Sequence, residues 1–227
     1  MLCISAHWDA VTPRLAGAVL HPAIQHDFYG FPPALYAQTW PARGDMALGH
    51  WLRDTLSVQG LPVTIEERPF DHGVWLPFKC IWPTAPLPVF QLSLCVRQGG
   101  PWHLALGEAL APLREAGVLI VGSGGITHNL HEIHWHAPEG TAASWSVEFM
   151  GALEAALASG DRTALCQPWT LPHGRRAHPT LEHYFPFLVA LGAAGTQGLE
   201  PVHRNWMFGT LALHAYGSSP AGRAAMA

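Results

Sequence analysis

The chain has 227 residues, of which 49% are hydrophobic and only 12% are charged, and its formal net charge is -4. This composition excludes an intrinsically disordered chain, and the 12 scattered Lys and Arg residues form no basic patch of the kind that binds nucleic acid. The length suits one sizeable core, so we expect a single domain over residues 1–227.

The cysteines and the apolar runs indicate the compartment. The four cysteines form no C-x-x-C pair, and three of them lie in apolar runs, which indicates buried, reduced thiols. The longest nearly apolar run, residues 185–195, is too short to cross a bilayer. The N-terminus lacks the basic start of a signal peptide. We therefore expect a cytoplasmic protein without a membrane partner.

The first half of the chain alternates predicted strands and helices. Leu2, Cys3 and Ile4 indicate a strand that delivers His7 at its end, and an ordered, aromatic loop follows over residues 21–36. Leu48, Trp51 and Leu52 repeat at helical spacing. Further strands are expected over residues 61–65 and 88–94, and helices over residues 45–56, 74–81 and 103–116.

The central stretch, residues 117–136, combines a strand, a glycine turn and four histidines. The β-branched run 118–121 is typical of a fully buried strand in a parallel sheet, and it ends in Gly122-Ser123-Gly124-Gly125. In open α/β sheets, ligands bind beyond the carboxyl ends of the strands. We therefore expect chemistry at His128 and Asn129.

The second half of the chain is predicted to complete the fold. A helix is expected over residues 143–158, a polar loop over 174–176, a second helix over 179–191 and a closing strand over 206–216. The small, polar tail beyond Gly217 is expected to fray. Alternating strands and helices predict a three-layer α/β/α sandwich with a mostly parallel, mixed central sheet.

Histidine is the unusual residue of this chain, with 15 copies. Four of them lie at the ends of elements or in glycine turns, and several such histidines in one domain favour metal binding or acid–base chemistry: His7, His72, His128 and His183. A lone histidine of this kind is more often a hydrogen-bonded structural residue. His131, His134 and His136 are assigned to that structural class. Neither H-E-x-x-H nor G-x-S-x-G occurs, and the glycine turn fails G-x-G-x-x-G.

Five motifs in order along the chain carry a resemblance to a known family. They are S-A-H-W (5–8), H-D-F-Y-G-F-P (26–32), F-D-H-G-V-W (70–75), G-S-G-G-I-T-H-N-L (122–130) and P-T-L-E-H-Y-F-P (179–186). Together they resemble the DODA-type class III extradiol ring-cleavage dioxygenases, the relatives of 4,5-DOPA dioxygenase in the protocatechuate 4,5-dioxygenase catalytic-subunit superfamily.

The resemblance implies a non-haem Fe(II) enzyme, with zinc as an alternative metal in the same site. Such an enzyme inserts both atoms of O₂ into a small aromatic diol, a catechol such as DOPA. By this resemblance His7 and His183 are metal ligands, with Glu182 a weaker candidate. His128 is expected both among the metal residues and as the acid–base residue, and His72 is expected to be a second catalytic residue. His26, Asn129 and Tyr184 are expected at the substrate. A homo-oligomer is possible, and the sequence leaves the oligomeric state open.

One departure from the family pattern affects the metal site. In the family, an H-G-S-P-type turn after an earlier strand supplies a further histidine ligand, and no such turn occurs here. We therefore expect an N-terminally truncated chain, or else a substitute ligand from His21 or His26. Two other functions stay open: a non-catalytic binding protein with the same fold, and a zinc-dependent hydrolase that uses the same histidines.

Overall fold

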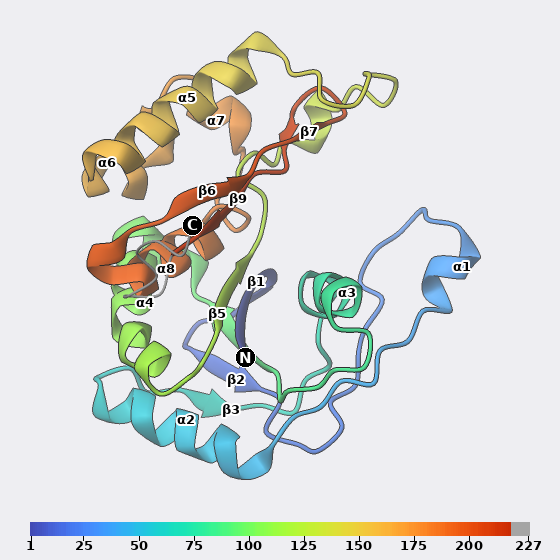
Figure 1. Cartoon of the computed structure of the whole chain (residues 1–227), viewed down its shortest axis with the longest axis vertical. Helices are drawn as coiled ribbons and strands as arrows, with labels where there is room; N and C mark the ends of the chain where they lie inside the picture. The colour runs from blue at the N-terminus through green and yellow to red at the C-terminus, as the bar shows by residue number, and fades with distance from the viewer. Residues whose placement is uncertain (219–227) are drawn as a thin grey trace, which may run out of the picture.

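A five-stranded sheet lies at the centre of the computed structural model, which describes residues 1–218 (Figure 1). Its strand order is β3-β2-β4-β1-β5. β1 pairs in parallel with both β4 and β5, whereas β2 runs parallel to β3 and antiparallel to β4. The strands are β1 (Leu2–Asp9), β2 (Arg14–Ala16), β3 (Thr64–Ile65), β4 (Phe90–Leu94) and β5 (Ile120–Ser123).

Helices cover both faces of this sheet. α3 packs against β1 on one side, and the paired helices α4 and α8 cover the other side (Figure 1). This arrangement confirms the predicted three-layer α/β/α sandwich with a mostly parallel, mixed sheet. The helices are α1 (Pro33–Tyr36), α2 (Met46–Val58), α3 (His72–Ile81), α4 (Gly99–Glu115), α5 (Ser144–Ser159), α6 (Arg162–Cys166), α7 (Gly174–Ala177) and α8 (Phe185–Ala194).

β1 is the strand that joins the two halves of the core. Its side chains alternate between faces: Leu2 and Ile4 belong to the apolar cluster with α4 and α8, whereas Cys3 packs in the cluster with Trp75 and Phe78 of α3. The strand is longer than the predicted run 2–4 and ends at Asp9. Because both of its faces are buried, its sequence lacks the apolar–polar alternation that marks a longer strand.

Most predicted helices are present, with shifted ends. The predicted cap Asp45 accepts the N–H of Leu48 at 2.9 Å and starts α2. The predicted helix over 179–191 begins only at Phe185, because Pro186 suits the first helical turn and residues 179–184 form turns instead. The predicted loop over 174–176 is the single helical turn α7.

Two strand predictions are wrong. The run 118–121 was predicted to be fully buried, but β5 (Ile120–Ser123) is half-buried, because it is an edge strand with only β1 beside it among residues 1–218. The predicted closing strand over 206–216 is broken into short pieces that form two separate ribbons outside the sheet. These pieces are β7 (Trp206–Met207), β8 (Leu211–Ala212) and β9 (Ala215–Gly217); β7 pairs with β8, and β9 pairs with β6 (Glu200–His203), which precedes the predicted run.

The remaining predictions concern loops and termini. The aromatic loop is ordered, and its residue Ile24 bridges to Phe70 beside α3. Three cysteines are buried and unpaired as expected, while Cys80 is exposed. Over residues 1–218, no helix is long and apolar enough to cross a membrane. The predicted fraying of the tail falls on residues 219–227, outside the described residues.

Candidate active site

Four histidines that were singled out in the sequence gather at the carboxyl ends of β1 and β5. The ring centre of His7 lies 4.0 Å from that of His72 and 4.9 Å from that of His183. The rings of His128 and His183 stack with their centres 3.3 Å apart and their planes 6° from parallel. Residues 176 positions apart in the chain therefore form one continuous cluster of imidazoles.

A buried polar network positions His72 beside His7. Ser5 donates to the carboxylate of Asp71 at 2.7 Å, and Gln91 donates to the other oxygen of the same carboxylate. Asp71 precedes α3, so these bonds fix the start of the helix, where His72 is the first residue, against β1. Gly73 makes the approach possible, since a Cβ there would lie 2.4 Å from Ser5 Oγ and 3.2 Å from the His7 ring.

The glycine turn after β5 brings His183 to His128. A Cβ on Gly124 would lie 2.2 Å from the carbonyl oxygen of His183, and the N–H of Gly125 donates to that same oxygen at 3.1 Å. The N–H of His128 donates to the carbonyl of Ala177 at 2.9 Å. The turn therefore needs glycine because backbone from the segment before α8 occupies the place of a side chain.

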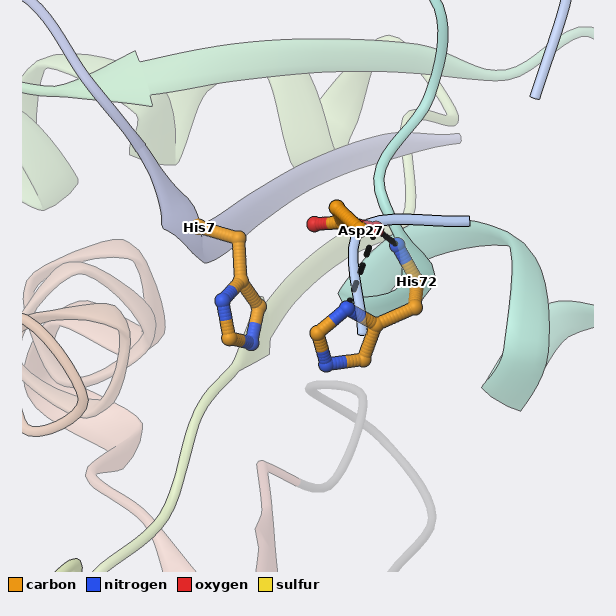
Figure 2. A group of neighbouring side chains, drawn as sticks. All are labelled: His7, Asp27 and His72. Atoms are coloured by element: carbon orange, nitrogen blue, oxygen red, sulfur yellow. Dashed lines mark hydrogen bonds and ion pairs between the residues drawn. The ribbon is translucent and has the colours of Figure 1, made fainter. Parts of the chain in front are cut away.

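The cluster contains two groups of side chains that could hold a metal ion. His7, Asp27 and His72 form one group, shown in Figure 2, and His128, Glu182 and His183 form the other; within each group the ligand atoms lie within 4.8 Å of one another. Imidazole and carboxylate ligands suit iron and zinc. An ion about 2.1 Å from a nitrogen of two imidazoles holds their ring centres roughly 5 Å apart, which agrees with His7 and His183.

Burial favours the neutral, metal-binding form of three of these imidazoles, those of His7, His128 and His183. Burial, followed by the neighbouring imidazoles of His128 and His7, lowers the pKa of His183 to about 2. Burial also lowers the pKa of His7, with the charge of His72 as the next cause, and it lowers the pKa of His128. A neutral imidazole has one free lone pair, so the donor set fits a divalent metal ion.

Asp27 is the residue of this site that the sequence analysis missed. It follows His26 in the H-D-F-Y-G-F-P motif, and its Oδ1 accepts the backbone N–H of His72 at 2.9 Å. His21 and His26 were the proposed substitute ligands, but among residues 1–218 neither belongs to a potential metal-binding group. The adjacent Asp27 does, and its place in the motif was the only signal that could have identified it.

The three predicted substrate residues lie in different surroundings. His26 lies in the aromatic loop, where its Nε2–H donates to the carbonyl of Gln38 at 2.9 Å and its ring meets Trp75 edge-on. Asn129 caps the short helix η2 (Leu130–Glu132) and donates to the carbonyl of Arg176.

Tyr184 is not brought to the cluster. It is fully buried in the core, and its hydroxyl donates to the carbonyl of Leu165 at 2.9 Å, away from the imidazoles. The adjacent position in the E-H-Y-F-P motif therefore serves packing, because consecutive residues of a turn point in different directions. His131, His134 and His136 are exposed and lie outside both ligand groups.

Comparisons with known proteins agree with the motifs. Residues 1–217 match the family described as the catalytic LigB subunit of aromatic ring-opening dioxygenase. The chain is 37% identical over 220 residues to a 4,5-DOPA dioxygenase extradiol of Beta vulgaris, which covers 95% of this chain and 81% of that protein. It is 34% identical over 207 residues to the protein of the same name from Escherichia coli K12, over 89% and 74% of the two chains.

A solved structure is also similar. The crystal structure of an uncharacterized protein from Escherichia coli K12 matches with a TM-score of 0.78 and 28% identity, over 95% of this chain and 84% of that one. The similarity therefore extends over nearly the whole of this chain.

Proposed function

The chain belongs to the family of the catalytic LigB subunit of aromatic ring-opening dioxygenases and is an extradiol ring-cleavage dioxygenase, and from this premise we propose that it uses Fe(II) and O₂ to open the ring of a catechol such as DOPA. The relatives named 4,5-DOPA dioxygenase extradiol support this choice of substrate class. The observation that carries the proposal is the cluster of four imidazoles at the carboxyl ends of β1 and β5.

His7 and His183, one residue from each of the two ligand groups, are the proposed metal ligands. Their ring centres are 4.9 Å apart, and the lowered pKa of each keeps a lone pair free at neutral pH. Held by these residues, Fe(II) would supply Lewis acidity toward the diol and the one-electron chemistry that O₂ requires. The protein must then orient the ring and move protons between defined atoms.

His128 is the proposed acid–base residue. Its ring lies flat on His183, so it stays beside the metal ligand without needing to bind the ion itself. Glu182 lies within the same group, and its charge acts against the effect of burial on the pKa of His128. A neutral imidazole in this place accepts a proton from the diol and later returns it.

The aromatic loop is the proposed wall for the substrate ring. Phe28 meets the rings of both Trp75 and Tyr36, and its edge-on contact with His72, at 5.7 Å between ring centres, connects this wall to the imidazole cluster. Aromatic side chains in such arrangements favour a further aromatic ring beside them. The small diol and O₂ are the proposed partners, and the cytoplasm is the proposed location.

Oxygen consumption tests the proposal. The chain is loaded anaerobically with Fe(II), DOPA or another catechol is added, and O₂ uptake is followed together with the absorbance of the yellow ring-opened product. We expect uptake and product in the parent chain and in the exposed-site control His131→Ala, and their loss in His183→Ala. Hydrolysis without O₂ uptake after zinc loading would identify a hydrolase, and catechol binding without turnover would identify a binding protein; either result contradicts the proposal.

A further inference from the structure

The carboxylate of Asp27 contacts His72 at two places. Its Oδ1 accepts the backbone N–H of His72 at 2.9 Å and lies 3.1 Å from Nδ1 of the His72 ring. The two residues are far apart in the chain, one in the aromatic loop and the other at the start of α3. The loop is therefore joined to the site through one carboxylate oxygen, as Figure 2 shows.

The position of this carboxylate determines which nitrogen of His72 carries the proton. Nδ1 is buried and makes no well-aligned hydrogen bond within residues 1–218, and the charged atom that it faces is Asp27 Oδ1, 3.1 Å away. A neutral imidazole has one N–H and one lone pair, and a carboxylate only accepts. The proton therefore belongs on Nδ1, and the lone pair belongs on Nε2.

The same arrangement aims the free nitrogen into the site. Figure 2 shows Nδ1 turned toward Asp27 and the second ring nitrogen on the opposite edge, with the His7 ring facing His72 across the gap. The ring centre of His7 lies 4.0 Å from that of His72 on one side, and the ring centre of Phe28, in an edge-on contact, lies 5.7 Å from it on another. Packing on two sides and the carboxylate on a third leave the ring little freedom to rotate.

The charge of Asp27 is also maintained. Burial alone would raise the pKa of this carboxyl, but the hydrogen bonds with His72 act against burial, and the pKa is lowered instead. The Asp27 carboxylate accepts the N–H of the first residue of α3, and the partial positive charge of a helix N-terminus further favours a negative charge there. Asp27 therefore remains an acceptor at neutral pH.

We propose that Asp27 is a positioning residue that holds His72 as the Nδ1–H tautomer, so that Nε2 accepts a hydrogen bond from a hydroxyl of the bound diol. This inference rests on the proposed function for the identity of the ligand. The tautomer itself is a property of the metal-free, substrate-free chain. Asp27 acts through His72 and is not itself a metal ligand in this account.

The tautomer is read by nitrogen NMR of the metal-free chain with ¹⁵N-labelled histidine, in which His72→Gln identifies the His72 signals. We expect Nδ1 of His72 to be protonated in the parent chain and in Asp27→Asn, which keeps a carbonyl acceptor. In Asp27→Ala we expect the Nε2–H form to dominate. The matched control is Glu148→Gln, because Glu148 forms an exposed pair with His173 at 2.9 Å outside the site; it leaves the His72 signals unchanged.

Two results would overturn the proposal. The first is an Nε2–H tautomer in the parent chain, which decides the matter even if Asp27→Ala fails to fold. The second is the loss of zinc binding in a folded Asp27→Ala chain, because that result would make Asp27 a metal ligand. We expect the zinc affinity of this variant to stay within about tenfold of that of the parent chain, which is less than the usual effect of removing a group that supports a metal ligand.

Kinetics then separates this inference from the proposed function. Removing a carboxylate that orients a site histidine costs roughly 10–100-fold in activity, so we expect a loss of that size in kcat/KM for the catechol in Asp27→Ala and substantial recovery in Asp27→Asn. Equal kcat/KM in the parent and in Asp27→Ala would contradict the positioning role. A parent chain without O₂ uptake but with the Nδ1–H tautomer would overturn the proposed function and leave the Asp27–His72 assignment standing.

Discussion

His128 and His183 stack with their ring centres 3.3 Å apart and their planes 6° from parallel. Two imidazoles at this distance cannot both carry a charge without strong repulsion, and burial lowers the pKa of each. We propose that the pair divides the work of the site, with His183 as the metal ligand and His128 as the acid–base residue beside it.

Replacing His128 tests this division. We expect His128→Ala to bind Fe(II) nearly as well as the parent chain but to lose roughly 10²–10⁴-fold in kcat, the usual contribution of a general acid–base residue. Metal titration and O₂ uptake measure the two properties separately. The control His131→Ala changes an exposed histidine and leaves both values unchanged. Unchanged turnover in His128→Ala would remove the acid–base role.

A substitution in the glycine turn tests how closely the backbone of His183 packs against it. Gly124→Ala would place a Cβ 2.2 Å from the carbonyl oxygen of His183, so the segment before α8 must move. We expect a loss of about 1–3 kcal/mol in the free energy of unfolding, measured by urea titration, together with weaker metal binding. Gly151→Ala is the matched control, because its Cβ would meet nothing within 4 Å in α5. That variant is expected to gain about 0.5–1 kcal/mol. Equal effects in the two variants would contradict the role of the turn.

Acid is predicted to destabilise the metal-free chain. Burial is the main cause that lowers the pKa of His103 to about 4, of His178 to about 4 and of His183 to about 2. These residues stay neutral in the folded chain below pH 6.5, whereas the unfolded chain takes up their protons. The free energy of unfolding therefore falls by about 1.4 kcal/mol per pH unit for each histidine as the pH drops from about 6.5 toward 4. The contribution of His183 continues to fall below pH 4, because its pKa is lower.

Urea unfolding at pH 7.5, 6 and 5 checks this dependence before most carboxylates titrate. His103 provides an internal test, because its Nδ1–H donates to the carbonyl of Gly99 and its Nε2 accepts the N–H of Cys95, an arrangement that only the neutral ring permits. Replacing His103 by Gln should reduce the slope, whereas replacing the exposed His136 should leave it unchanged. A stability independent of pH across this range would show that these histidines are not buried in the neutral form.

Replacing an aromatic side chain of the loop is expected to weaken substrate affinity. Phe28 contacts His72, Tyr36 and Trp75, so Phe28→Ala should raise KM for the catechol by roughly three- to tenfold, the worth of one aromatic contact, with a smaller effect on kcat. Its neighbour Tyr29 is 88% exposed and serves as the control, with kinetics like those of the parent chain. A change in kcat alone would place Phe28 outside the substrate wall.

The parts of the structure that depend on local patterns were predictable from the sequence. The run 2–4 and the glycine turn marked the two strands whose carboxyl ends hold His7 and His128, and Asp45 marked the start of α2. Contacts between distant segments were not predictable in the same way. Asp27 reaches His72 across 45 residues, and no period or spacing in the sequence encodes that contact.

The burial of individual side chains was the second feature that the sequence did not reveal. Tyr184 lies next to His183 in the same motif, yet it packs in the core, because a turn sends successive side chains to opposite sides. The apolar run before the glycine turn resembled a strand with neighbours on both sides, although β5 is half-buried at the edge of the sheet. A sequence shows that a segment is apolar, but the surrounding fold determines what covers it.

Isotope labelling tests the central claim most directly. The chain loaded with Fe(II) is given a catechol under ¹⁸O₂, and the ring-opened product is trapped and weighed by mass spectrometry. The account predicts that both oxygen atoms of one O₂ molecule enter each product molecule. A product that carries no label, or the return of the unchanged catechol under conditions in which Fe(II) is bound, would contradict it.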